Sequence, residues 1–288
     1  MVSTEHKGLS PSSLTLFTGC QRRYFYKKVV KVPVDSDVEE EVESLQVGKA
    51  FHQVLEDSKH VLEGFPLAAI QAIVANHELS DEVHTPLIFA MLKSYKDMHE
   101  KAGLTATHYE VEVSTDKFFG YVDVILQDEV GNWWIGDMKT AASFSQNLVP
   151  TLPMHPQLNL YAAHYKEIAA QLGLDPLKYK GCRYRLTTKS KMNRKEGEDF
   201  MSYVGRMLKT IKSFDFILPK EIMRPELFAS IHGAAESYIK AHATDAEPTN
   251  FCQNFSNCMN FFRPCEFFSR CHGKNFSEMN RLEVITSE

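Results

Sequence analysis

The fold is decided by the stretch GYVDVILQDEVGNWWIGDMKT, residues 120–140. Two apolar runs rich in Val, Ile and Trp, residues 120–126 and 133–135, have the composition of buried strands. The segment between them contains three residues typical of a hairpin turn, Asp128, Gly131 and Asn132. We therefore expect two neighbouring strands joined by a short turn.

Three ionisable residues belong to these two strands. Asp123 lies inside the first apolar run, where an unpaired carboxylate would be costly to bury, so we expect it to have a partner. Asp137 and Lys139 follow the second run two residues apart, which places both on one face of an extended chain. An isolated Asp-x-Lys is ordinarily a surface ion pair. With a second acid nearby, the set favours a Mg²⁺ or Mn²⁺ site that hydrolyses phosphodiesters.

This pattern resembles the PD-(D/E)XK nuclease superfamily, specifically its RecB-like branch, which includes AddB-type nucleases and the CRISPR-associated adaptation exonucleases. The resemblance implies an α/β fold with a restriction-endonuclease-like core, in which a mixed central β-sheet is flanked by helices and carries a helical insertion. Val122 stands where the proline of the family name would precede the first Asp. The matching residues, in chain order, are Gly48, His52, Leu55, Glu56, Asp123, Asp137, Lys139, Gln157 and Tyr161.

The resemblance also implies a role for each residue. His52, Asp123, Asp137 and the main-chain carbonyl of Met138 would hold one or two Mg²⁺ or Mn²⁺ ions. Lys139 would orient the attacking water. Gln157 and Tyr161, four residues apart on one helix face, would hold the DNA strand. Glu110 or Glu112, in an alternating segment that predicts a strand over residues 107–113, could also face the metals.

Four of the six cysteines lie within residues 252–271. In a reducing compartment such clustering indicates metal binding rather than disulfides. The resemblance implies a [4Fe-4S] cluster whose ligands join the N- and C-terminal regions: Cys20, Cys258, Cys265 and Cys271. Six residues separate Cys258 from Cys265, where the family has two, so Cys252 remains an alternative to Cys258. Zinc is the competing metal. Phe267 is one of several phenylalanines expected to surround the cluster.

Length and composition are those of a globular protein. The 288 residues are 43% hydrophobic, enough for a full core, and we find neither a signal peptide nor a membrane span, so we expect a soluble cytoplasmic protein. We predict a single nuclease domain over residues 1–288. Its parts are an N-terminal helix with Cys20 (10–35), a helical region with His52 (45–105), the catalytic core (106–215), and a C-terminal helix with the cysteine cluster (216–288).

The net charge of −5 argues against a protein that coats nucleic acid non-specifically. One basic run nevertheless contains six cations and no acid, and either contacts phosphates or is a solvated loop. Its members are Arg183, Arg185, Lys189, Lys191, Arg194 and Lys195. We further expect a strand over residues 180–188, a long helix over residues 198–214, and surface positions for His77, His84 and His99.

By resemblance, the chain is a metal-dependent exonuclease acting on DNA ends or single strands in recombination, repair or replication. The alternative is a DNA-binding or scaffolding subunit of a repair, replication or CRISPR-adaptation complex, with a subordinate or silent nuclease site.

Overall fold

The structure is a computed structural model of the chain. It describes residues 9–32, 43–58, 66–115, 118–242, 247–254, 259–260, 263–265, 267 and 270–271. Contacts divide the chain into two compact units, one formed by residues 42–230 and the other by residues 1–41 with 231–288.

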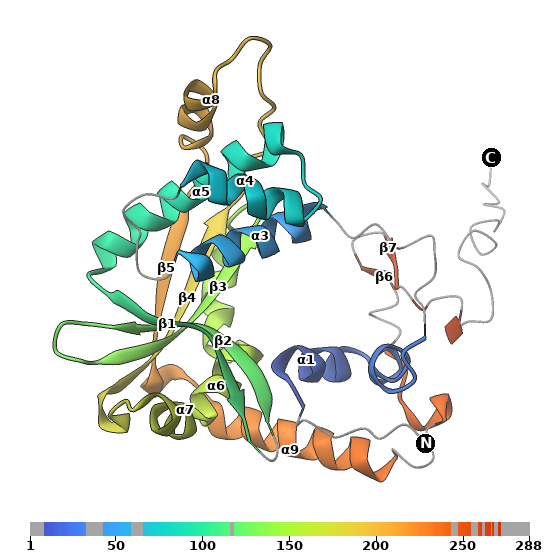
Figure 1. Cartoon of the computed structure of the whole chain (residues 1–288). Helices are drawn as coiled ribbons and strands as arrows, with labels where there is room; N and C mark the ends of the chain where they lie inside the picture. Colours follow the sequence, from blue (N-terminus) through green and yellow to red (C-terminus); the bar gives the residue numbers. More distant parts are fainter. Residues whose placement is uncertain are drawn as a thin grey trace, which may run out of the picture. The chain divides into compact units, whose positions relative to one another are not determined.

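The larger unit is built on a five-stranded mixed sheet (Figure 1). Its strands lie in the order of the chain, with β1 antiparallel to β2, β2 antiparallel to β3, β3 parallel to β4, and β4 antiparallel to β5. This agrees with the predicted α/β class. The strands are β1 (Thr105–Ser114), β2 (Phe119–Gln127), β3 (Trp133–Ala141), β4 (Tyr179–Thr188) and β5 (Ser213–Pro219).

The predicted hairpin is confirmed as β2 and β3. Its turn is closed by Asp128, whose Oδ1 accepts hydrogen bonds from the main-chain N–H groups of Val130 and Asn132 at 3.1 and 2.8 Å. Gly131 has a φ of +83°, a left-handed conformation that glycine adopts without a Cβ clash. β3 continues beyond the predicted apolar run, so Asp137 and Lys139 lie within the strand.

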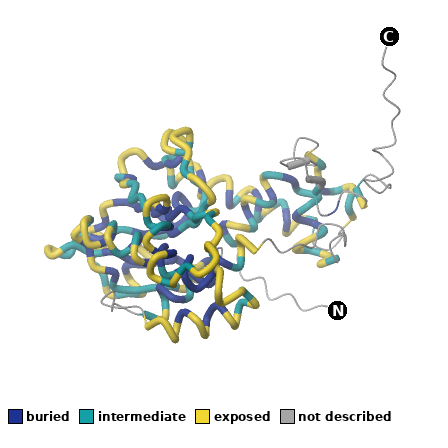
Figure 2. The backbone as a smooth tube through the Cα atoms, turned by 90° about the horizontal axis from the view of Figure 1, so that it is seen from above, coloured by how far each residue is buried: buried dark blue, intermediate teal, exposed yellow. Residues whose placement is uncertain are grey.

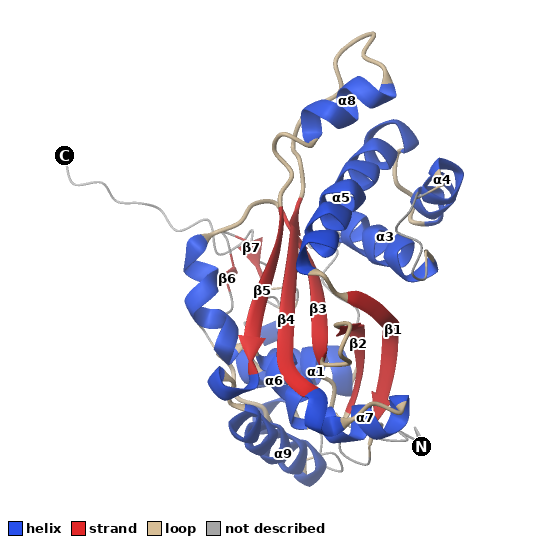
Figure 3. Cartoon of the chain, turned by 90° about the vertical axis from the view of Figure 1, so that its left-hand side faces the viewer, coloured by secondary structure: helices blue, strands red, loops and turns tan. Residues whose placement is uncertain are grey.

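Helices cover both faces of the sheet (Figure 3). On one face Arg185 of β4 donates to the Tyr95 hydroxyl of α5, whereas on the other the Cys182 thiol donates to the Leu158 carbonyl of α6. Because side chains alternate along a strand, these contacts assign α5 and α6 to opposite faces. The helices of this unit are α3 (Glu43–Asp57), α4 (Leu67–Asn76), α5 (Asp81–Ala102), α6 (Pro156–Ala163), α7 (Tyr165–Leu172) and α8 (Phe200–Met207), with 3-10 segments η3 (Gln146–Met154), η4 (Pro176–Lys178) and η5 (Lys220–Ile222).

The main apolar core lies where α3, α4, α5 and α8 pack together and against the sheet. Phe51, Ile88 and Tyr95 are each at most 1% exposed, as are Val124 and Leu126 of β2. Figure 2 shows buried residues gathered in the interior of the larger unit and exposed ones along its outer turns. The core fixes α3 relative to β2 and β3.

Two predictions for this unit are wrong. Residues 198–214 form not one long helix but the short α8 followed by β5, where Phe214, Phe216 and Leu218 alternate with Ser213 and Asp215 in the period-two pattern of a strand. His84 and His99 are buried rather than on the surface: His84 Nε2 lies 2.5 Å from a Glu43 oxygen, and His99 Nδ1 lies 2.7 Å from an Arg185 nitrogen.

The predicted N-terminal helix begins as expected in the smaller unit but ends at Gly19, and Cys20, which the prediction placed within it, has an extended backbone. Ser10 caps α1 (Pro11–Gly19) by accepting a 3.2 Å hydrogen bond from the Ser13 N–H, and Pro11 occupies the first helical position. The other elements of this unit are α2 (Gln21–Tyr24), the π-helical turn η1 (Phe25–Val29), η6 (Pro248–Asn250), β6 (Met259–Asn260) and β7 (Arg263–Pro264). The boundary between the two units falls within α9 (Pro225–Ala241). Among the described residues, no helix has the length and apolar character needed to cross a bilayer.

Candidate metal centre

A cavity of about 670 Å³ lies between α3 and the end of β3. Its lining includes His52 and Glu56 from α3 and Met138 and Lys139 from β3. Gly48, one helical turn before His52, permits the close approach of the helix, since a Cβ there would lie 2.9 Å from Thr140 Oγ1. The glycine four residues before His52, which the family pattern also has, therefore serves the packing of α3 against β3.

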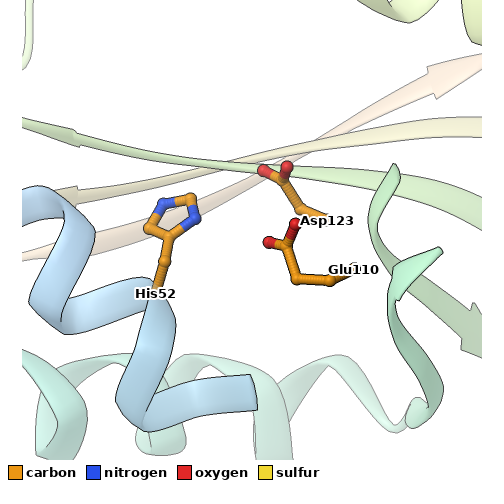
Figure 4. Close-up of side chains that lie close together, drawn as sticks. All are labelled: His52, Glu110 and Asp123. Atoms are coloured by element: carbon orange, nitrogen blue, oxygen red, sulfur yellow. The ribbon is translucent and has the colours of Figure 1, made fainter. Parts of the chain in front are cut away.

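Three side chains from different elements converge beside this cavity (Figure 4). They are His52 of α3, Glu110 of β1 and Asp123 of β2, and one ligand atom of each lies within 4.8 Å of the others. One imidazole nitrogen and two carboxylates suit Mn²⁺ or Mg²⁺, which favour oxygen ligands. Sequence reasoning named Glu110 only as one of two strand acids that could face a metal, and the fold brings this one to the site.

The backbone of Glu110 is unusual. Its φ is +45°, in the left-handed region that non-glycine residues rarely adopt and that is uncommon within a strand. On either side the register is regular, with Tyr109 opposite Val124 and Val111 opposite Val122, so Glu110 stands opposite Asp123. Such local strain, of the order of 1–3 kcal/mol, persists where surrounding packing enforces it and is concentrated at functional sites.

A second pair of groups lies on β3. Asp137 is 1% exposed, and its Oδ1 accepts a 2.7 Å hydrogen bond from Lys139 Nζ. Its Oδ2 is buried without a hydrogen-bond partner among the described residues, so one carboxylate oxygen is left to bind a ligand. Asp123 is connected to the same strand, because its Oδ2 accepts a 2.6 Å bond from the Met138 N–H.

The predicted ligand set is therefore brought together in part. His52 and Asp123 join Glu110 in one group of possible ligands, whereas Asp137 is outside that group of mutually close atoms among the described residues. Asp137 still affects the site electrostatically, since its charge opposes the lowering of the His52 pKa. Met138 hydrogen-bonds His52 through its backbone, which places the main chain of Met138 next to the imidazole.

The protonation of these groups follows from burial. Burial and then the Lys139 charge lower the pKa of His52 to about 4, so the imidazole is neutral at pH 7 and can coordinate a metal. Burial, Asp123 and Glu56 raise the pKa of Glu110 to about 7. Burial also raises the pKa of Asp123 and Asp137. The protein does not fully offset the cost of burying these carboxylates in their charged form, and a bound divalent cation would offset it.

Lys139 is the cation that the chain itself supplies. Burial lowers its pKa, but the Asp137 and Asp123 carboxylates raise it by more, so the net shift is upward and the amine is an ammonium. It is held by Asp137 at the edge of the cavity. The arrangement places a fixed positive charge next to the cluster of acids.

Gln157 and Tyr161 of α6 lie beside β2. The Gln157 amide is 3.5 Å from the Tyr161 hydroxyl, and that hydroxyl donates to the main-chain carbonyl of Tyr121, two residues before Asp123. Tyr161 is 3% exposed. It therefore anchors the strand that carries Asp123, and its predicted contact with DNA remains a prediction.

Sequence reasoning also missed His155, the N-cap residue of α6. Its ring lies 5.4 Å from Tyr184, its charge would lower the pKa of Asp137, and its buried Nδ1 has no hydrogen-bond partner among the described residues. No motif in the sequence indicates it, because its proximity depends on how α6 packs against β3 and β4.

In the smaller unit, the segment around Cys20 hydrogen-bonds with the segment around Cys252, and the predicted metal cluster would link the same two regions of the chain. Arg22 N–H donates to the Cys252 carbonyl at 3.1 Å, and Asn254 donates to the Gly19 carbonyl at 2.8 Å, so residues 19–22 pair with residues 252–254. Phe267 is fully buried, and its ring lies tilted against that of Tyr26 with the centroids 5.5 Å apart. Burial and then the Cys271 charge raise the pKa of Tyr26. Cys258 lies outside the described residues.

The sequence of the chain matches the model of a known protein family. The family model of the PD-(D/E)XK nuclease superfamily matches residues 8–272, which includes His52, Asp123, Asp137 and Lys139. A comparison with curated proteins gives no match.

Proposed function

The chain belongs to the PD-(D/E)XK nuclease superfamily, whose members are metal-dependent nucleases, and we propose that it is a DNA exonuclease acting on DNA ends or single strands. The observation that carries the proposal is the convergence of His52, Glu110 and Asp123 within 4.8 Å, beside the Asp137–Lys139 pair. The proposed biological setting is DNA recombination, repair or replication.

In this proposal His52, Asp123, Asp137 and the Met138 carbonyl would hold Mg²⁺ or Mn²⁺, and Glu110 would add a carboxylate. When bound, the metal would acidify a water and neutralise charge on the scissile phosphate. The residues fit such an ion because the imidazole is neutral and Asp137 Oδ2 has no other partner among the described residues.

The remaining chemistry is supplied by the chain. The Lys139 ammonium, fixed by Asp137, orients the attacking water and stabilises negative charge on the phosphate. Gln157 of α6 would donate from its amide to a phosphate oxygen of the DNA strand. Tyr161 positions β2 through the Tyr121 carbonyl and so keeps Asp123 in place.

A second metal belongs to the same proposal. A [4Fe-4S] cluster with Cys20, Cys258, Cys265 and Cys271 as ligands would fasten the N-terminal segment to the C-terminal one, and zinc is the alternative. The hydrogen bonds between residues 19–22 and residues 252–254 support a link between these segments. In this role the metal is structural.

The nuclease proposal is tested with labelled DNA. Linear single-stranded DNA, blunt duplex DNA and circular single-stranded DNA are incubated with MnCl₂, MgCl₂ or EDTA. We expect metal-dependent shortening of linear DNA and an intact circle, since an exonuclease needs an end. Asp137→Asn and Lys139→Met should each reduce the rate about a hundred-fold or more.

The matched controls are Asp97→Asn and Lys180→Met, which change exposed residues away from the cavity. They should cut like the wild type. If the wild type leaves every DNA intact with both metals, the nuclease proposal is wrong and a binding or scaffolding role replaces it. If the circle is cut, the enzyme is an endonuclease.

A further inference from the structure

The sheet face that carries Asp137 continues into a row of aromatic side chains. Asp137 of β3 is directly beside Tyr184 of β4, and Tyr184 is directly opposite Phe216 of β5. One residue pair further along, Lys139 is beside Leu186 and Leu186 opposite Phe214. Because paired residues share a sheet face, Phe214 and Phe216 lie on the same face as the candidate catalytic groups, two strands away.

Phe144, just after β3, completes an aromatic cluster with Phe214 and Phe216. Its ring centroid lies 4.4 Å from that of Phe214 and 5.6 Å from that of Phe216, and the ring planes are within 32° and 29° of parallel. All three rings are half-buried, so part of each surface remains accessible. These rings form a stacking surface at the sheet edge.

A second cavity, of about 500 Å³, lies over this surface. Phe144 and Phe214 line it together with three lysines, Lys189, Lys191 and Lys212, and none of its lining residues, all of which are described, is acidic. Four hydroxyl side chains complete the polar lining: Ser143, Thr188, Ser190 and Thr210. Its chemistry, aromatic faces beside cations, is that of a site for unpaired nucleotides.

Lys189 connects this cavity to the candidate metal centre. It lines both cavities, and its ammonium donates to the Ser44 carbonyl and, at 2.9 Å, to the Ser44 hydroxyl at the start of α3. A strand whose phosphate lies at Lys139 could therefore continue past Lys189 toward Lys191 and Lys212.

The basic run of the sequence is divided by the fold. Arg183 and Arg185 do not contribute to this surface, because both are buried on the opposite face and both bond to Asp215, at 3.1 and 3.0 Å. Arg194 Nε donates to the Glu198 carbonyl at 2.8 Å. From this run, Lys189 and Lys191 line the second cavity.

We propose that the cavity lined by Phe144, Phe214, Lys191 and Lys212 is a subsite for single-stranded DNA. One or two unpaired bases stack on Phe144 and Phe214, and the adjoining phosphates contact the lysines. The inference deepens the proposed function, since it names the form of DNA that reaches the same metal centre. Duplex DNA does not suit the subsite, because its bases are already stacked and paired.

Binding is tested without cleavage, in EDTA, with fluorescent 12-residue oligothymidylate and a hairpin duplex of matched length. Phe144→Leu keeps an apolar side chain against Phe214 and Phe216 but removes the aromatic face, and should weaken oligothymidylate binding about ten-fold. Phe144→Tyr should bind like the wild type. Phe89→Leu, which changes a half-buried ring of α5 that pairs with Phe200, is the control.

A spectroscopic variant reports stacking directly. Phe144→Trp adds a tryptophan whose emission should be quenched by saturating oligothymidylate, whereas the emission of the wild type, with only Trp133 and Trp134, should change little.

The phosphate contacts are tested by the salt dependence of binding. Lys191→Ala should lower the slope of log Kd against log salt by about 0.7, the value for one phosphate contact on a single strand. Lys180→Ala, at the other end of β4, should leave this slope unchanged.

The two proposals fail in different ways. Binding that depends on Phe144 without cleavage by any metal contradicts the nuclease proposal and leaves the subsite in place. Active enzyme in which Phe144→Leu binds as tightly as the wild type and Phe144→Trp is not quenched overturns the subsite. Equal affinity for the hairpin duplex also overturns it.

Discussion

The Asp123 carboxylate accepts a 2.6 Å hydrogen bond from the main-chain N–H of Met138, the residue between Asp137 and Lys139. The bond joins the acid of β2 to the strand that carries the other candidate catalytic groups. Because Asp123 is 8% exposed, this bond is formed in a site shielded from water.

Asp123→Asn should separate metal binding from folding. The amide oxygen can still accept from Met138, and the substitution removes a buried carboxylate whose pKa is raised by burial, so we expect a thermal midpoint equal to or above that of the wild type without metal. Mn²⁺ affinity, measured by calorimetry, should fall at least ten-fold. Unchanged Mn²⁺ affinity would remove Asp123 from the ligand set.

Glu110→Gln tests the acid contributed by β1. Without metal, the variant should be more stable than the wild type, because it removes a partly buried carboxylate and its repulsion by Asp123 and Glu56. The rise in thermal midpoint on adding Mn²⁺ should be smaller, since the stabilisation by a ligand grows with the logarithm of its affinity for the folded state. Glu112→Gln, an exposed change on the same strand, is the control and should keep the wild-type response.

Tyr161→Phe removes the hydroxyl that donates to the Tyr121 carbonyl. We expect a loss of about 1 kcal/mol in the free energy of unfolding, measured with urea, because a carbonyl loses its partner in a protected position. If Tyr161 acts through β2, kcat falls while KM for DNA is unchanged. A higher KM with unchanged stability would instead favour direct contact with the DNA strand.

Stability should fall in acid through His99. Burial and then the neighbouring Arg185 lower the pKa of His99 to about 4, below its ordinary 6.5. The unfolded chain therefore takes up the proton first, so the stabilisation is complete above about pH 6.5 and is lost as pH falls toward 4. Between pH 7 and 5 this amounts to about 2 kcal/mol. Urea unfolding of His99→Gln should show a weaker dependence of the unfolding free energy on pH than urea unfolding of the wild type.

The cysteine prediction is tested by colour and metal content. Protein purified anaerobically should absorb visible light through iron–sulfur charge transfer and should contain iron and sulfide. Cys258→Ser and Cys252→Ser identify the fourth ligand, since only the true ligand should abolish the absorbance. Colourless protein that contains zinc would replace the cluster by a zinc site.

Local pattern determined the hairpin, the strands β1 and β4, and the order of the chemical groups. Turn residues and period-two alternation act over a few neighbouring positions, so Asp123, Asp137 and Lys139 could be placed on strands from the sequence. β5 carried the same alternating signal in residues 213–218, but the adjoining helical segment obscured it.

Tertiary structure decided which of these groups meet, and which cations face a ligand. Glu110 reaches the site because strand pairing places it opposite Asp123, and its backbone there has a positive φ. Arg183 and Arg185 are held away from the surface by Asp215, a residue about thirty positions later. Phe144 and Phe214 become neighbours through strand pairing. These contacts join residues that are far apart in the sequence. They depend on the energies of burial and strand pairing, which the local propensity of each segment does not reveal.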